Sequence, residues 1–408
     1  MKPNTIQKPP QVYLIITIIT GLLSLGFTLA ISGVGTGDFL TYYTAAEHAF
    51  QGKPFVGENA GMPSGPYVYL PITVLFYLPL TLFSPIVAYG LLFCINICGA
   101  LLASWQVIRL SNKLNIGLTM QDKLLITGAI LLAPPLIGNL LNAQPNFWLL
   151  VAFLTGYQLV EQDQQLLGGV IFALPAIFKL WPALLGVWLV YRCRWKAVVS
   201  AVATGTFAII TSVGVFGTAT NIAYFRYILH SRSWTELFAG GLSPEMGVIT
   251  IRRPISMLFP NLDPVYMALT GVIVLLPILL YYYSTANGQI GRLVAFEVTV
   301  IIILLILPSI TPYFIFPFAF AVPLLYILEP PKQHIAGVAS VCIVFIADAG
   351  HITTLLGISP VLSGVLRTIA WSILQYISIP LIGCLILLWI FRSTKTRDSD
   401  EEKPMLVN

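Results

Sequence analysis

The sequence predicts an all-α integral membrane protein, a polytopic helix bundle of about twelve spans within a range of ten to thirteen. Three observations lead to this fold class. Of the 408 residues, 57% are hydrophobic and only 9% are charged, compared with roughly 25% charged residues in a soluble domain. The mean hydropathy is +0.87. The apolar runs are long and continuous and do not alternate with polar residues, which favours spanning helices over a β-barrel.

The first span is expected at residues 12–32, and a Gly- and Pro-rich segment follows it. This segment leads to a short apolar run at 67–83, which contains two prolines. If the run crossed the membrane, the basic cluster at 109–123 would lie outside, against the positive-inside preference. We therefore expect 67–83 to form an interfacial or re-entrant helical part of a first extracytoplasmic loop over 33–85.

The remaining spans alternate from this starting point, because basic residues mark the cytoplasmic turns. Two of them, 166–180 and 182–191, are short helices separated by a proline, with Lys179 at their junction. The expected spans are 86–108, 124–141, 147–160, 166–180, 182–191, 197–217, 264–284, 293–308, 312–328, 335–350 and 366–391.

On this map, residues 1–391 form a single polytopic domain in the cell membrane, and both termini are cytoplasmic. A second extracytoplasmic loop covers 218–262, and the charged tail at 392–408 is expected to be disordered. Membrane lipids are the expected surroundings. Nucleic acid is not an expected partner, because no basic tract has the density of a nucleic-acid-binding patch.

Asp38 is the first acidic residue of a chain with only 16 Asp and Glu residues, and it follows the first span. An acid at the membrane edge should face water or a cavity, because it costs free energy in hydrocarbon, so Asp38 is a candidate functional residue. The alternative is that it caps a short surface helix. Tyr42 shares its helical face, and Tyr69 opens the interfacial run, although tyrosines at this depth are also ordinary interface anchors.

Lys179 is an isolated cation with apolar neighbours for about ten residues on each side. A lysine that snorkels to the interface is one interpretation. The functional interpretation is that Lys179 pairs with an anion, and a lipid phosphate is the obvious anion at this depth. The break at Pro182 exposes backbone groups at a helix end, which suits the wall of a cavity.

Arg252 and Arg253 lie in the second outer loop, where arginines run against the topology preference. Their planar guanidinium groups are suited to clamping a phosphate. Alternatively, the outer arginines form ion pairs with Glu236 and Glu245 or bind anionic headgroups.

The link between two spans at 142–146 holds the amides of Asn142, Gln144 and Asn146, which either bind sugar hydroxyls or form only a polar turn. Outside the charged tail at 392–408, the sequence has no Asp-x-Asp pair and no His/carboxylate cluster that would bind a divalent metal. We therefore expect neither a metal nor a cofactor, and Lys and Arg would neutralise a phosphate.

Several motifs occur in order between residues 12 and 320. They are Gly37-Asp38-Phe39 with Tyr42-Tyr43 and Ala45-Ala46, Gly52-Lys53-Pro54-Phe55, Tyr69-Leu70-Pro71, Gln144-Pro145-Asn146, Gly168-Gly169 leading to Lys179-Leu180-Trp181-Pro182, Arg252 or Arg253, and Pro308-Ser309. In order and spacing they resemble the GT-C superfold of membrane glycosyltransferases. In particular, they resemble glycosyltransferase family 87, the polyprenyl-phosphate-mannose-dependent mannosyltransferases.

The resemblance implies an inverting hexosyltransferase of the cell envelope. It implies that a sugar, expected to be mannose, moves from a polyprenyl- or dolichyl-phosphate donor to a lipid or glycan acceptor at the extracytoplasmic face. Asp38 would be the general base, with Lys179 and Arg252 near the donor phosphate. The expected substrate-binding residues are Tyr42, Tyr69, Gln144, Asn146, Lys179, Arg252, Arg253 and Tyr313.

Two positions depart from the family pattern. Leu70 replaces the first proline of the usual Tyr-x-Tyr-Pro-Pro, and the segment 311–313 reads Thr-Pro-Tyr where relatives often have a histidine, so Tyr313 is only a stand-in. A family member that keeps the fold without activity is therefore one further possibility.

A different class of function is a secondary transporter or lipid flippase that binds an anionic substrate through Lys179 and the outer arginines. It would give substrate flux across liposomes with no covalent product. The two matching halves shown by many transporters are absent, and this absence, with the two long outer segments, favours the enzyme.

Overall fold

The computed structural model describes residues 10–31, 37–57, 60, 67–228, 248–259, 261–307, 309–344 and 379–392. Within these residues the chain is almost entirely helical, which confirms the all-α prediction. The strands found there are β1 (Val248–Ile249) and β2 (Ser309–Ile310), an antiparallel pair. The middle of the second outer loop, most of the last predicted span and the C-terminal tail lie outside the described residues.

The chain forms two compact units, each assembled from separate stretches of sequence. One comprises residues 1–23, 107–135 and 242–408, and we call it the α14 unit. The other comprises residues 24–106 and 136–241, and we call it the α8 unit. The predicted single domain over 1–391 stays a prediction.

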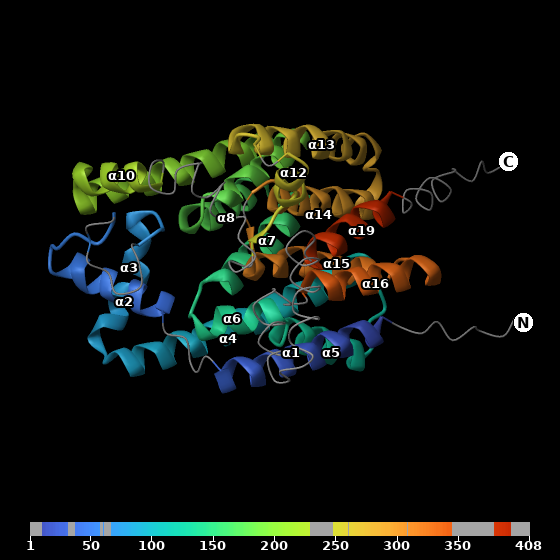
Figure 1. Cartoon of the computed structure of the whole chain (residues 1–408), viewed down its shortest axis with the longest axis horizontal. Helices are drawn as coiled ribbons and strands as arrows, with labels where there is room; N and C mark the ends of the chain where they lie inside the picture. The colour runs from blue at the N-terminus through green and yellow to red at the C-terminus, as the bar shows by residue number, and fades with distance from the viewer. Residues whose placement is uncertain are drawn as a thin grey trace, which may run out of the picture. The chain divides into compact units, whose positions relative to one another are not determined.

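The α14 unit is named after a helix that is apolar on nearly all sides apart from Glu297 and Thr299, and that is therefore buried. Every residue of α14 from Leu293 to Leu305 is buried, and the helix packs against α13, α15 and α19. The unit's helices are α1 (Gln11–Ile31, which begins in it), α5 (Met120–Leu131), α12 (Arg252–Leu258), α13 (Pro264–Thr285), α14 (Gly288–Ile306), η8 (Thr311–Phe314), α15 (Ile315–Leu325), α16 (Pro330–Val344) and α19 (Ile379–Phe391). Figure 1 shows α16 and α19 running side by side.

The α8 unit carries most of the predicted site. Its helices are α2 (Gly37–Phe50), η2 (Pro71–Thr73), α3 (Val74–Tyr77), η3 (Leu78–Leu82), α4 (Pro85–Lys113, which ends in the other unit), α6 (Pro134–Leu141), α7 (Asn146–Glu161), α8 (Gln165–Phe178), η4 (Trp181–Leu185), α9 (Gly186–Tyr191) and α10 (Trp195–Arg226). The predicted run at 67–83 is helical but forms three short consecutive helices. Pro71 and Pro79 each stand at the start of a 3₁₀ helix, where a missing backbone N–H is tolerated.

Three helices among the described residues are each long and apolar enough to cross a membrane, namely α4, α10 and α14. The predicted span 124–141 is instead two helices, α5 and α6, which reach the same criterion only together. Pro134 begins the second of them, because a proline ring cannot continue a preceding helix. α10 continues past its predicted end to Arg226, with a break at Gly217. The count of about twelve spans stays a prediction.

Gly169 allows α8 to pack closely against α10, and the two helices are neighbours in Figure 1. A Cβ atom added at Gly169 would clash with the hydroxyl of Ser200 and the carbonyl oxygen of Ala197. By contrast, a Cβ atom at Gly214, on α10, would meet nothing within 4 Å. The α8–α10 contact therefore depends on a missing side chain.

Gly169→Ala is expected to destabilise the protein by about 1–3 kcal/mol, the usual cost of overpacking. Gly214→Ala is the matched control and should be neutral or stabilising by up to about 1 kcal/mol, because alanine favours a helix more than glycine does. Thermal unfolding of both variants in the same detergent or nanodisc checks this prediction. Equal melting temperatures for the two variants would show that the α8–α10 contact is not as close as described.

Candidate functional site

Four polar side chains of the α8 unit form a continuous series of hydrogen bonds from a cation to an acid. Lys179 Nζ donates to Asn146 Oδ1 at 2.7 Å. Asn146 Nδ2 donates to Gln144 Oε1 at 2.9 Å, and Gln144 Nε2 donates to the Asp38 carboxylate. Each amide accepts a hydrogen bond from its neighbour on the Lys179 side and donates one to its neighbour on the Asp38 side. The charges at the two ends of the series favour this orientation of the amides. We call these four residues the polar bridge.

Asp38 lies in the first turn of α2, where the positive end of the helix dipole favours an acid. Its side chain is half-buried. The residue that donates to its carboxylate, Gln144, is 106 positions later in the chain. Asp38 therefore makes a tertiary contact in addition to any local contribution to the start of α2.

Lys179 is held by the break that the sequence predicted between two short helices. It is the residue after α8, with extended backbone angles, and Pro182 then opens η4. Its side chain is only 8% exposed. The ammonium group binds Asn146 and lies 5.9 Å from the centre of the Tyr69 ring. The charge is thus held inside the unit, and the side chain does not snorkel to its surface.

The three amides of the polar link before α7 all make hydrogen bonds within the protein, and sugar binding by them stays a prediction. Asn142 donates to the carbonyl of Gly138 at 3.0 Å and so belongs to the turn. Gln144 and Asn146 belong to the polar bridge. Asn146 also donates to Asn139, a fully buried residue of α6. Asn139 is not among the predicted site residues, although an amide inside an apolar helix needs a buried partner.

Tyr42 and Tyr69 meet beside the polar bridge. Their hydroxyls are 2.7 Å apart and hydrogen-bonded, and their rings stack at 5.3 Å. Burial, reinforced by Tyr69, Tyr77 and the charge of Asp38, raises the pKa of Tyr42 well above its usual value. The Tyr42 hydroxyl therefore keeps its proton and remains a hydrogen-bond donor.

The structure brings six of the nine predicted site residues into one place. These are Asp38, Tyr42, Tyr69, Gln144, Asn146 and Lys179. The other three belong to the α14 unit, so their participation in the site stays a prediction.

Arg252 begins α12 and is 1% exposed, and burial lowers its pKa to about 10. Tyr313 is a half-buried residue of η8. The side chain of Arg253 lies outside the described residues, as do Glu236 and Glu245, the ion-pair partners considered for the arginines. Among the side chains that the structure does describe, no group of three or more His, Cys, Asp and Glu residues is placed to hold a metal ion.

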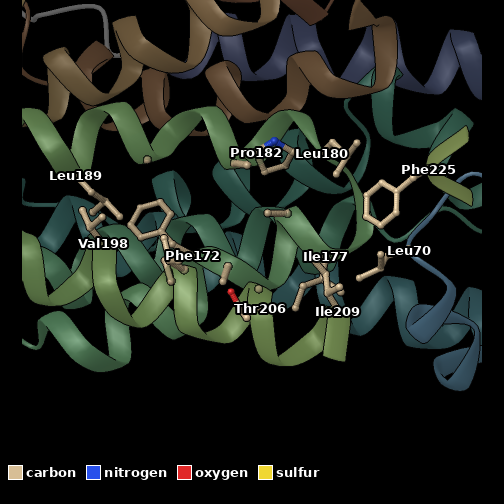
Figure 2. A pocket seen from close by; sticks show the side chains of 17 residues that line it. Leu70, Phe172, Ile177, Leu180, Pro182, Leu189, Val198, Thr206, Ile209 and Phe225 are labelled. Carbon is tan, nitrogen blue, oxygen red and sulfur yellow. The ribbon is translucent and has the colours of Figure 1, made fainter. Parts of the chain in front are cut away.

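An apolar groove of about 320 Å³ lies among α8, η4, α9 and α10. Figure 2 shows it extending from Leu70 and Phe225 at one end to Leu189 and Val198 at the other. Thr206 is the one residue with a polar side chain among those that line it. A groove of this shape and lining suits a hydrocarbon chain.

The groove is lined by chain neighbours of Lys179, although no residue of the polar bridge itself lines it. Ile177 and Leu180, two residues before and one residue after Lys179, both line it. Much of the remaining wall is made by small residues, which keep the space open. These are Ala173, Ala176, Ala183, Gly186, Ala201 and Gly205.

The model of glycosyltransferase family 87 matches residues 67–309, more than half of the chain. The chain belongs to glycosyltransferase family 87. It is therefore a glycosyltransferase, and its apolar helices indicate a membrane protein. No curated protein and no solved structure matches the chain.

In this family 87 glycosyltransferase, the polar bridge links residues inside and outside the matched range. Gln144, Asn146 and Lys179 lie within the range, whereas Asp38 precedes it. The hydrogen bond from Gln144 is therefore the observation that joins Asp38 to the family-matched part of the chain. A half-buried carboxylate and a buried ammonium, joined in this way, offer a proton acceptor and a fixed positive charge in one site.

Proposed function

We propose that this glycosyltransferase moves a hexose, specifically mannose, from a polyprenyl- or dolichyl-phosphate sugar to a lipid or glycan acceptor, with inversion. The observation that carries the proposal is the polar bridge, which holds the Asp38 carboxylate and the Lys179 ammonium in one hydrogen-bonded series. An inverting transfer uses one base for the acceptor and positive charge for the leaving group. In the polar bridge, the Asp38 carboxylate can serve as the base and the Lys179 ammonium can supply the positive charge.

The reaction assigns one event to each end of the bridge. Asp38 takes the proton of the acceptor hydroxyl as its oxygen bonds to C1 of the sugar. The bond between C1 and the phosphate oxygen breaks on the opposite face, and its electron pair leaves with the lipid phosphate. Lys179 stabilises the charge that develops there, as a fixed group in a water-poor site does most effectively.

The lipid part of the donor is assigned to the apolar groove. Because Lys179 lies between groove-lining residues along the chain, a phosphate beside its ammonium places the attached tail at the groove's end. Because the tail comes from hydrocarbon and not from water, its binding there is favoured by close packing against the groove wall. A sugar donor attached to a hydrocarbon chain therefore fits the apolar groove.

The proposed site faces the extracytoplasmic side, with both termini in the cytoplasm. This assignment rests on the distribution of basic residues, which leaves the loop containing Asp38 outside. On this side a lipid donor enters sideways from the outer leaflet, while the acceptor arrives from the leaflet or from the water.

Gly205→Leu is expected to weaken transfer from a long-chain donor. A Cβ atom at Gly205 meets nothing within 4 Å, so the added side chain enters the open groove. Steady-state assays should show a KM for a long polyprenyl-phosphate mannose raised about tenfold or more, and a KM for a short-chain analogue raised much less. Gly214→Leu, on the same helix but outside the groove, should leave both values unchanged. Equal effects on long and short donors would contradict the assignment of the groove.

The proposed function itself is tested with purified protein in nanodiscs, radiolabelled polyprenyl-phosphate mannose and extracted membrane lipids. We expect the label to appear in a new covalent product, together with free polyprenyl phosphate. In parallel proteoliposomes, flux of the intact donor without any new product would contradict a transferase and support a flippase.

A further inference from the structure

Tyr77 carries a buried hydroxyl group without a hydrogen-bond partner among the described residues. The residue is 1% exposed and ends α3. Its ring stacks on Tyr42, with ring centres 4.9 Å apart and planes at 24°. In the part of the chain that the structure describes, its hydroxyl oxygen is enclosed and has no hydrogen-bond partner.

An unpaired buried hydroxyl is unusual, because buried tyrosines normally place the hydroxyl against a partner. The neighbouring tyrosines follow this rule. Tyr42 and Tyr69 pair with each other, and the Tyr67 hydroxyl is 2.7 Å from the Thr73 hydroxyl. Tyr77 is thus the exception among these tyrosines, and an unpaired buried polar group calls for a specific explanation, such as a role in the site.

Tyr77 packs against α2, the helix that carries Asp38, because its ring stacks on Tyr42 of that helix and α3 contacts α2. Burial, followed by Tyr69 and the charge of Asp38, raises the pKa of the Tyr77 hydroxyl well above the usual value, so it stays protonated and able to donate. One carboxylate oxygen of Asp38 accepts a hydrogen bond from Gln144. Asp38 is half-buried, whereas Tyr77 is enclosed.

We propose that Tyr77 binds a second hydroxyl group of the acceptor, adjacent to the hydroxyl that Asp38 deprotonates. This inference rests on the proposed function and names the accepting group more closely. A single alcohol satisfies Asp38 alone, whereas a sugar with neighbouring hydroxyl groups satisfies both residues. The accepting end of the acceptor is therefore a carbohydrate with adjacent hydroxyls, whether it is attached to a lipid or to a glycan.

The test removes the second hydroxyl of the acceptor and the hydroxyl of Tyr77 separately. The probes are octyl α-D-mannopyranoside, below its micelle concentration, and its monodeoxy analogues. Their affinities are measured by thermophoresis for the wild-type protein and Tyr77→Phe, both in nanodiscs. We expect one monodeoxy analogue to bind the wild type about tenfold more weakly than the parent glycoside, the effect of one neutral hydrogen bond. Tyr77→Phe should bind the parent and that analogue equally.

Tyr67→Phe is the matched control, because it deletes one tyrosine hydroxyl from the same cluster. The hydroxyl of Tyr67 is paired within the protein, so its loss should lower the melting temperature and leave the preference for the parent glycoside intact. Tyr77→Phe should leave the melting temperature of the empty protein unchanged or raise it, since no internal hydrogen bond is lost. A structural role for Tyr77 would instead lower it.

Two results would overturn the inference. One is a Tyr77→Phe protein that still prefers the parent glycoside by the wild-type factor, as expected if the hydroxyl binds only a buried water. The other is a wild-type protein that binds none of the glycosides. Loss of the preference in Tyr77→Phe, combined with no transfer from polyprenyl-phosphate mannose, would contradict the proposed donor and leave the acceptor site supported.

Discussion

Replacing Asp38 by asparagine is expected to reduce sugar transfer by about 10²–10⁴-fold, the usual contribution of a general base. The asparagine Oδ1 still accepts the hydrogen bond that Gln144 donates to the carboxylate. Folding and insertion should therefore be unchanged, while proton removal from the acceptor is lost. Single-turnover assays with radiolabelled polyprenyl-phosphate mannose, together with melting temperatures, measure the two effects separately.

Glu47→Gln is the matched control for Asp38→Asn, because it neutralises another acid of the same helix, α2. We expect its transfer rate to stay within about twofold of the wild type, since the half-buried Glu47 is not part of the polar bridge and glutamine has nearly the same size and shape. An Asp38→Asn protein with wild-type activity would remove Asp38 from the role of base. Equal losses in both variants would indicate that α2 needs its negative charge for stability only.

Replacing Lys179 is expected to have the second largest effect. Lys179→Gln removes the charge but keeps an N–H donor that can reach Asn146, so the polar bridge retains its hydrogen-bonding pattern. Transfer should fall by about 10²–10³-fold, the range seen when one group that stabilises transition-state charge is removed. Thermal stabilisation of the protein by undecaprenyl phosphate should weaken in parallel.

Two further variants separate the effect of the Lys179 charge on transfer from the effect of its hydrogen bond on stability. Lys179→Met should lose activity and also stability, because it leaves Asn146 Oδ1 without its donor. Lys196→Gln, an exposed lysine of α10, should change neither. If Lys179→Gln binds undecaprenyl phosphate as the wild type does, Lys179 does not contact the donor phosphate.

The sequence was informative about the site where a residue conflicts with its surroundings. Asp38 at a span end and Lys179 in an apolar run both stood out because charge is costly there, and the structure joins them through Gln144 and Asn146. The break between two short helices at Lys179 was also predictable, since Pro182 cannot continue a helix.

The partners of these residues were less predictable. Asn139 lies in an apolar helix seven residues before Asn146, and only the fold shows that its side chain faces the polar bridge. Tyr77 is one of 18 tyrosines, and composition does not reveal which of them lacks an internal partner. Glu297 is fully buried on α14, and its carboxyl has no hydrogen-bond partner in the described structure. The sequence map placed it in a span without marking it.

Helix ends were predicted less well than helix existence. The apolar run at 124–141 looks continuous by hydropathy, but Pro134 starts a new helix within it. α10 continues nine residues beyond the predicted end at 217, with Gly217 at φ 78° and ψ 165°. There Asn221 donates to the carbonyl of Gly217 and accepts from the hydroxyl of Ser212. These hydrogen bonds lie within α10 on both sides of its break, and they leave no periodic signal in a sequence.

The stereochemistry of the product tests the central claim most directly. The claim is that Asp38 acts as a single base in a direct displacement of a lipid phosphate. Polyprenyl-phosphate mannose labelled with ¹³C at C1 is incubated with purified protein and membrane lipids, and the anomeric configuration of the product is read by NMR from the one-bond carbon–proton coupling. We predict a glycoside inverted relative to the donor. A product with retained configuration would contradict the mechanism, because retention requires a second displacement for which the polar bridge provides no second carboxylate.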